Sequence, residues 1–178
     1  MIETELGNLR RSHYSNELNA SMDGTQVTVM GWVLTVRGHG NISFATVRDK
    51  NGDLSIVAKK GDCPDEIREK ISSLKAHSSI GVIGTIKASE KAPSGFEIIP
   101  NELRVFSEVT TIPPFEPTAK TVKNIDTRLE VRPIDLRRDV LQHIFKTRSL
   151  VLKTIRDYFN DQNFVEINTP KMIATATE

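Results

Sequence analysis

The sequence predicts a mainly β protein with some α structure, in which a small five-stranded barrel is followed by a hinge and then by a helix and a strand. Two observations carry this prediction. Up to Ser107, runs rich in β-branched and aromatic residues recur between turn residues, with one helical pattern among them. After a proline-rich interval, apolar residues repeat at helical spacing over Asp139 to Asn160. We therefore expect three parts, 1–107, 108–138 and 139–178.

The composition is that of an ordinary globular protein, and it excludes several kinds of site. The 24 Lys and Arg residues nearly balance the 23 Asp and Glu residues, so any basic surface must be local. The single cysteine, Cys63, excludes an intramolecular disulfide, and neither it nor any histidine suggests a metal site. No stretch approaches the roughly 20 apolar residues that cross a bilayer. We expect a cytoplasmic protein without a signal peptide or a membrane partner.

The first three strands are expected in the amino-terminal part of the barrel. The first covers Thr25 to Arg37, and Gly31 within it indicates a bend or a bulge. The next two lie within Ile42 to Ala58 and flank the segment "DKNGD". Asn51 and Gly52 predict a tight two-residue turn between them, with positive φ angles.

A helix and two further strands complete this part. In "CPDEIREKISSLKAH", Pro64 suits a first helical turn, and Ile67, Ile71 and Leu74 repeat at helical spacing. The segments "SIGVIGTIK" and "FEIIPNELRVFS" supply the last two strands. Three strands, a helix and two strands are the order of an OB-fold, a five-stranded barrel. A Greek-key sandwich is the alternative, but it would normally need more strands.

The strand "ISFATVR" poses a question about its two faces. Because side chains alternate along a strand, Ala45 and Val47 share one face, and Phe44 shares the other with Thr46 and Arg48. If the small apolar face fills the barrel, Phe44 points outwards, where an aromatic ring beside basic groups can stack on an unpaired base. If the faces are reversed, Phe44 belongs to the core. The residues alone leave both possibilities open.

The chain after Ser107 contains an irregular interval followed by a long helical pattern. The interval 108–138 has little periodicity and reads as a hinge. Its excess of basic residues either contacts phosphates or forms ion pairs with acidic residues of the same solvated linker. The helix over Asp139 to Asn160 has an apolar stripe, and "FVEINTP" resembles a strand that ends at Pro170. One helix and one strand cannot bury that stripe by themselves.

Three segments resemble a known family. "GWVLTVRGHGNISFATVRDKNGDLSIV" is similar to the anticodon-binding barrel of the class II aminoacyl-tRNA synthetases specific for aspartate, asparagine and lysine. "NIDTRLEVRPIDLRR" resembles the segment that leads into their catalytic domain, and "FVEINTPKMIATATE" resembles the end of class II motif 1. "RSHYSNEL" and "TATE" favour the archaeal-type aspartyl enzymes. The resemblance covers nearly the whole chain from Arg11 onwards.

The resemblance implies roles for four barrel residues. Phe44 matches the aromatic residue that stacks on the central anticodon base, a uracil in aspartate tRNA. Arg37 matches the basic residue at the anticodon-facing end of the first strand, and Glu97 matches an acidic residue that lies against the anticodon bases. Ser55 stands where the family generally has a glutamine that bonds to the uracil. Its shorter hydroxyl makes a bridging water an alternative to direct contact.

Two further positions bear on tRNA specificity. Enzymes that accept only aspartate tRNA tend to carry a tryptophan where this chain has Leu34, and a lysine where it has Pro93. Proline has no donor to offer to a base. The resemblance therefore implies relaxed specificity, for both aspartate and asparagine tRNA.

The last segment resembles the first helix and strand of a class II synthetase α+β catalytic domain. Its helix resembles the one at the class II dimer interface, so we expect Phe145 and Leu152 to lie in a homodimer interface, with Pro170 as the motif proline. Glu178 matches the acidic residue of a loop that closes over bound aspartate in the parent enzyme. The alternative for Glu178 is an ordinary frayed terminal residue.

The parent reaction implied by the resemblance joins aspartate to tRNA through an aspartyl-adenylate, with ATP and Mg²⁺. The groups for that chemistry lie in motifs 2 and 3, which this sequence lacks, so we expect an inactive fragment that contains no catalytic residue and binds no cofactor or metal. The alternatives are a free-standing OB-fold module for single-stranded nucleic acid, an asparaginyl-tRNA synthetase fragment, and a tRNA-binding accessory factor.

Overall fold

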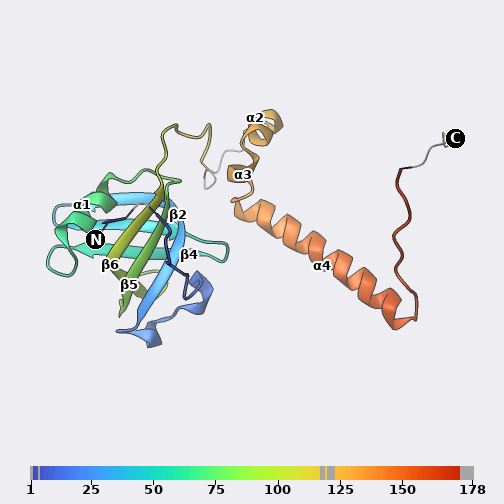
Figure 1. Ribbon diagram of the computed structural model, residues 1–178, viewed down its shortest axis with the longest axis horizontal. Coiled ribbons are helices and arrows are strands. Elements are labelled where there is room, and N and C mark those ends of the chain that lie inside the picture. The colour runs from blue at the N-terminus through green and yellow to red at the C-terminus, as the bar shows by residue number, and fades with distance from the viewer. Residues whose placement is uncertain (1, 4, 117–118, 120–122, 173–178) are drawn as a thin grey trace. The chain divides into compact units, whose positions relative to one another are not determined.

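The computed structural model describes residues 2–3, 5–116, 119 and 123–172. The chain forms two compact units, Met1–Thr111 and Ile112–Glu178 (Figure 1). The predicted domain limits at 107 and 138 stay a prediction.

The first unit is a closed β-barrel with one helix. Its main strands are β2 (Gln26–His39), β3 (Ile42–Arg48), β4 (Asp53–Lys59), β5 (Ser79–Ala88) and β6 (Phe96–Ser107). The helix α1 (Asp65–Ser73) lies between β4 and β5 in the chain, and two short 3₁₀ helices (Ser15–Glu17 and Ala20–Met22) precede β2. The sheet order is β1-β6-β4-β3-β2-β5, and β5 also pairs with β6, which closes the barrel (Figure 1). The predicted five-stranded OB-fold is confirmed, and the short β1 (Ile2–Glu3) adds an unpredicted edge strand.

Strand β2 serves two neighbours and must therefore bend across the barrel. It pairs with β5 up to Trp32 and with β3 from Trp32 onwards. The expected bulge is displaced from Gly31, since the register shift lies between Val33 and Thr35. Gly31 instead permits a close approach: an added Cβ would lie 2.4 Å from the carbonyl oxygen of Arg48. Strand β2 can therefore cross so near to β3 only because this position has no side chain.

The turn between β3 and β4 differs from the prediction. It has four residues, Asp49 to Gly52, and neither Asn51 nor Gly52 has a positive φ. The amide of Asp49 donates to the carbonyl of Gly52 at 3.0 Å. The Asp49 carboxylate accepts from the backbone amides of Asn51 at 2.7 Å and of Gly52 at 3.1 Å. An aspartate at the first position can hold such a turn with negative φ angles, so the left-handed conformation is unnecessary.

The core of the barrel is aliphatic except for Phe96 of β6. The inward-facing residues of all five main strands and the two isoleucines of α1, Ile67 and Ile71, form one buried cluster. The side chains that fill it include Val33, Val47 and Ile56, each at most 1% exposed. The outer face of β3 is thereby left to other side chains.

The second unit contains helices α2 (Ile125–Glu130), α3 (Arg132–Asp135) and α4 (Asp139–Asp161). The interval expected to be a plain hinge thus includes two short helices, the first capped by the Asn124 side chain, which accepts from the Thr127 amide. The Asp135 carboxylate is fully buried and pairs with Arg128 at 3.0 Å, Arg132 at 2.8 Å and Arg138 at 3.8 Å. These three arginines are thus paired within the unit, around a buried carboxylate rather than in a solvated linker.

Helix α4 begins at the predicted residue and ends one residue beyond the predicted end, and none of its residues is buried. The expected strand at 164–170 is wrong, because this stretch has no regular secondary structure. A strand needs a neighbouring strand for its backbone hydrogen bonds, and the described residues of this unit contain no strand that could pair with this stretch. Within the described part of the chain, no helix is long and apolar enough to cross a membrane.

Candidate nucleic-acid interface

A cavity of about 550 Å³ opens on the outer face of β2, β3 and β4. Its lining combines one aromatic ring, one guanidinium group, an imidazole and several hydroxyls with the apolar residues Ala45 and Ile56. The lining residues are Thr35, Arg37, Gly38, His39, Phe44, Ala45, Thr46, Ser55 and Ile56. A volume of this size lies within the range of about 300–1,000 Å³ that is typical of small-ligand sites.

The orientation of Phe44 follows from the alternation of β3. Ser43, Ala45 and Val47 are buried in the barrel, whereas Phe44 is 40% exposed. The prediction that Phe44 points outwards is confirmed, and the reversed assignment of the faces is wrong. The interior of a small barrel has room for the alanine and the valine of this strand, and the large ring lies on the outer surface.

The cation nearest to Phe44 in the strand register is Arg37. Arg37 of β2 lies directly opposite Phe44 of β3, and both line the cavity. Arg48, at the end of β3, is engaged elsewhere: its Nε and Nη2 donate to the two oxygens of Asp53 at 2.6 and 2.9 Å. The guanidinium group that can meet a ligand beside the ring is therefore that of Arg37.

Three hydroxyl residues lie next to this aromatic and basic pair. Thr35 on β2, Thr46 on β3 and Ser55 on β4 are aligned by the register of the three strands. The Thr35 hydroxyl donates to the Thr46 hydroxyl at 3.2 Å. All three residues line the cavity. We call this set the hydroxyl row.

The structure brings together only some of the residues predicted for the barrel. Arg37, Phe44 and Ser55 line the cavity, whereas Leu34, Pro93 and Glu97 do not. The predicted roles of all six stay predictions.

The other predicted residues lie in several places. Leu34 is half-buried at the register shift of β2, Pro93 is exposed in the loop between β5 and β6, and Glu97 is half-buried opposite Lys87. Phe145, Leu152 and Pro170 are exposed in the second unit. Glu178 lies outside the described residues.

The sequence interpretation missed Thr35, His39 and Thr46 as lining residues. For Thr46 a signal existed, because the alternation of β3 placed it on the same face as Phe44. For Thr35 and His39 the sequence carries no such signal. Thr35 is aligned with Thr46 only through the register shift between Val33 and Thr35, which depends on the pairing of two strands.

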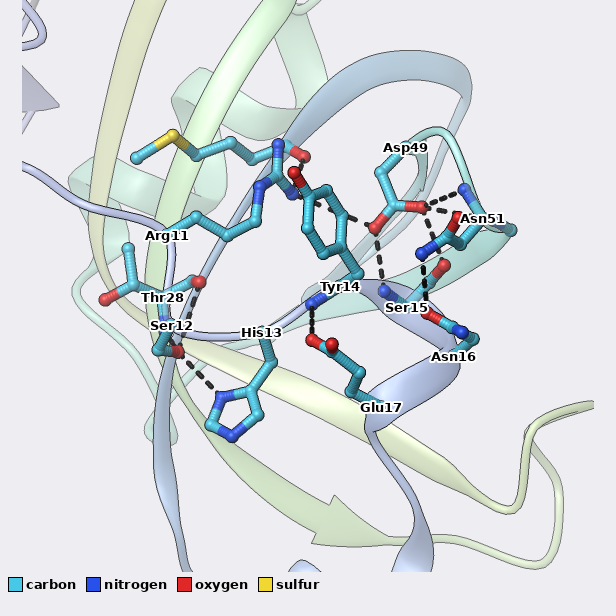
Figure 2. Close-up of polar contacts among 12 residues, drawn as sticks. Arg11, Ser12, His13, Tyr14, Ser15, Asn16, Glu17, Thr28, Asp49 and Asn51 are labelled. Atoms are coloured by element: carbon cyan, nitrogen blue, oxygen red, sulfur yellow. Dashed lines mark hydrogen bonds and ion pairs between the residues drawn. The ribbon is translucent and has the colours of Figure 1, made fainter. Parts of the chain in front are cut away.

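A second polar cluster, also missed, attaches the segment before β2 to the turn between β3 and β4 (Figure 2). The Ser15 amide and hydroxyl each donate to the Asp49 carboxylate at 2.7 Å. Arg11 lies 3.8 Å from the same carboxylate and donates to the carbonyl of Met30 at 2.7 Å. The Tyr14 ring has the Arg11 guanidinium 4.4 Å and the Lys50 ammonium 4.2 Å from its centre.

The electrostatics of Asp49 follow from these contacts. Burial by itself raises the pKa of the Asp49 carboxyl group. Hydrogen bonds from the Ser15 hydroxyl and from the amides of Asn51, Ser15 and Gly52 outweigh burial and bring the pKa below its ordinary value. Asp49 is thus a charged structural group at neutral pH, and it stabilises the hairpin that carries Phe44 and Ser55.

Comparison with protein families identifies both units. Residues 27–106 match the family described as OB-fold nucleic acid binding domain. Residues 124–178 match the family described as tRNA synthetases class II (D, K and N).

Curated relatives extend the match to almost the whole chain. It is 43% identical over 173 residues to an aspartate–tRNA(Asp/Asn) ligase of Methanococcus aeolicus, which covers 97% of this chain and 40% of the relative. It is 45% identical over 169 residues to the enzyme of the same name from Methanocaldococcus jannaschii, which covers 95% of this chain and 39% of the relative. The chain therefore spans about two fifths of the length of these relatives.

Solved structures give a similar result. Asparaginyl-tRNA synthetase from Pyrococcus horikoshii, complexed with asparaginyl-adenylate, aligns with a TM-score of 0.84 and 27% identity, over 96% of this chain and 38% of that chain. Aspartyl tRNA synthetase from Entamoeba histolytica aligns with a TM-score of 0.82 and 25% identity, over 97% of this chain and 41% of that chain.

Proposed function

We propose, on the premise that this chain belongs to the family of class II aspartyl-tRNA synthetases, that its barrel binds the anticodon loop of a tRNA. One observation carries the proposal. Phe44 is exposed in a cavity on the outer face of the barrel, directly opposite Arg37. An exposed ring beside a cation is what recognition of an unpaired base requires.

Phe44 and Arg37 would contribute to the binding free energy through different interactions. Stacking of one base on an aromatic ring is worth about 1–3 kcal/mol and tolerates any base. The Arg37 guanidinium would meet a phosphate or a base edge, and a phosphate contact makes binding weaken as salt rises. Glu97 and Ser55 would add contacts to the bases, with a water bridging Ser55 where its hydroxyl is too short.

The parent enzyme would join aspartate to tRNA in two steps through an aspartyl-adenylate. That chemistry needs ATP and Mg²⁺, but the described residues contain no group of three or more His, Cys, Asp or Glu side chains placed to hold a metal ion. In the parent enzyme Glu178 would contact the bound aspartate.

We propose that the 178-residue chain does not activate aspartate by itself, since the residues for that reaction belong to motifs that its sequence does not contain. Exchange of pyrophosphate into ATP, measured with aspartate and the purified chain, tests this. Exchange above the rate without protein would overturn the proposal.

The location of the parent enzyme is proposed to be the cytoplasm.

We also propose relaxed tRNA specificity, for aspartate and asparagine tRNA. Leu34 and Pro93 support it, because neither side chain can donate a hydrogen bond to a base. The names of the archaeal relatives, aspartate–tRNA(Asp/Asn) ligase, support it too. Binding to anticodon stem-loops that differ only in C or U at the third anticodon position tests this. A preference for C above about tenfold, or 1.4 kcal/mol, would overturn it.

The fragment of an asparaginyl-tRNA synthetase is the second candidate. The alignment to the Pyrococcus horikoshii structure favours it, whereas the identity to the aspartate enzymes is higher. If the full-length protein charged asparagine rather than aspartate onto tRNA, the second candidate would replace the first. A free-standing nucleic-acid-binding module would leave the second unit without a role.

Substitution of Phe44 tests the main proposal. Phe44→Ala should weaken binding of an aspartate-tRNA anticodon stem-loop by about fivefold to 150-fold, the equivalent of one stacked base. Phe44→Trp keeps a flat ring and should retain binding. Phe164→Ala is the control, because Phe164 is an exposed phenylalanine of the second unit. Wild-type affinity in the folded Phe44→Ala protein would overturn the proposal.

A further inference from the structure

The hydroxyl row, Thr35, Thr46 and Ser55, crosses three adjacent strands and lines the cavity. Thr46 lies opposite Thr35 on one side and opposite Ser55 on the other. Because residues two apart on a strand share a face and lie about 6.6–7 Å apart, the row runs beside the pair formed by Phe44 and Arg37. A base stacked on Phe44 would therefore have one edge over the row.

The hydrogen bonds within the row leave donors and acceptors for a ligand. Thr35 and Thr46 share one hydrogen bond of 3.2 Å. Whichever hydroxyl donates, the pair keeps one proton and several lone pairs for another partner. Ser55 makes no hydrogen bond through its hydroxyl within the part of the chain that the structure describes. The bond between the threonines also restrains both side chains before any ligand arrives.

We propose that Thr46, together with Thr35 and Ser55, reads the edge of the base that stacks on Phe44. This inference rests on the proposed function. Uracil presents two carbonyl acceptors with an N–H donor between them, and a hydroxyl can both accept from the N–H and donate to a carbonyl. A row of hydroxyls can thus match that edge. The ring of Phe44 provides affinity for any base, and the row provides the dependence on which base is present.

The chain offers a matched control for this row. The Thr85 hydroxyl on β5 donates to the Asn101 side chain, also at 3.2 Å, and Thr85 does not line the cavity. Thr85→Val therefore removes a cross-strand hydroxyl of the same kind from a strand outside the site. Thr46→Ser is a rescue variant, since it keeps the hydroxyl and removes only a methyl group.

The experiment compares two anticodon stem-loops, one with uracil at the central anticodon position and one abasic there. Thr46→Val and Thr35→Val should each bind the uracil loop about threefold to tenfold more weakly than the wild type. Both should bind the abasic loop with wild-type affinity, because no base edge is present to lose. Thr46→Ser and Thr85→Val should bind both loops as the wild type does.

The outcomes separate the inference from the proposed function. If both valine variants keep wild-type affinity for the uracil loop while Phe44→Ala loses it, the inference is overturned and the proposed function stands. If Thr46→Val weakens both loops equally, the threonine contacts the backbone of the RNA, which also overturns the inference. If Phe44→Ala binds normally, the proposed function fails, and the inference fails with it. Equal thermal midpoints of the variants establish that each has folded.

Discussion

Ser15 and Asp49 are joined by two hydrogen bonds of 2.7 Å, although 34 residues separate them in the chain (Figure 2). One bond comes from the Ser15 amide and one from its hydroxyl. They tie the segment before β2 to the turn between β3 and β4, the two strands that carry Phe44 and Ser55. The position of the proposed tRNA-binding face therefore depends on a polar contact outside that face.

Ser15→Ala should lower the free energy of unfolding at pH 7 by about 1.5–3 kcal/mol, the worth of a hydrogen bond to a charged group. The folded state lowers the pKa of Asp49, so this stabilisation is fully present above the unfolded pKa of about 3.9 and is lost as the pH falls through the folded pKa. Urea titrations between pH 7 and pH 2 should show the two proteins converging in acid. A difference that stays constant into acid would contradict the assignment. Ser107→Ala, at an exposed serine, is the control.

Gly31→Ala should destabilise the barrel by about 1–3 kcal/mol or more. Its Cβ would lie 2.4 Å from the Arg48 carbonyl oxygen and 2.8 Å from a methyl group of Val47, so backbone must move. Gly38→Ala is the matched control in the same strand, because its nearest neighbour would be the Ser72 Cβ at 4.0 Å. Thermal unfolding of the two variants measures the difference. Equal midpoints would mean that β2 and β3 can separate without cost.

Arg37→Gln should reduce the salt dependence of tRNA binding. If the guanidinium contacts one phosphate of a single-stranded loop, the slope of log K against log salt should decrease in magnitude by about 0.7. Binding of the anticodon stem-loop across a salt series measures this. Arg10→Gln removes an exposed arginine whose guanidinium donates to the neighbouring carbonyl of Leu9, and its slope should equal that of the wild type. An unchanged slope for Arg37→Gln would exclude a phosphate contact.

We predict that the apolar face of α4 drives self-association. Large apolar side chains are exposed along the helix, Phe145 at 44% and Leu152 at 46% among them, and such a surface favours association. Analytical ultracentrifugation should show dimers or larger species that increase with concentration. Phe145→Gln combined with Leu152→Gln should shift the equilibrium towards monomer, whereas Lys146→Gln should not. A wild-type chain that stays monomeric at high concentration would contradict the proposed homodimer.

Asp135→Asn should loosen α2 and α3. The buried carboxylate pairs with Arg128, Arg132 and Arg138, so its loss leaves three guanidinium groups without their shared anion. Breaking a fully buried ion pair costs roughly 3–5 kcal/mol of stability. The loss of stability in Asp135→Asn should be smaller, because the guanidinium groups keep some contact with water. Amide hydrogen exchange over 125–136 should become about tenfold faster. Asp126→Asn, at an exposed aspartate of α2, should change it little, and equal effects of the two variants would contradict a special role for Asp135.

Part of the candidate site was predictable from the chain and part was not. The outward orientation of Phe44 follows from a two-residue period once Ala45 and Val47 are assigned to the interior. The turn at Asn51 and Gly52 was predicted wrongly, because the Asp49 carboxylate supplies a hydrogen-bonding pattern that a two-residue motif does not reveal. The strand expected at 164–170 is absent, since alternation cannot supply the neighbouring strand that a ladder needs.

The order of the strands and the helix of the barrel, the extent of α4 and the resemblance to class II synthetases could be predicted from the chain alone. These depend on spacing and residue type along the chain, which are local properties. The alignment of Thr35, Thr46 and Ser55 in one row and the bonds between Ser15 and Asp49 are visible only in the folded chain. Those contacts depend on the register between strands and on the path of β2, which are set by the packing of the whole barrel.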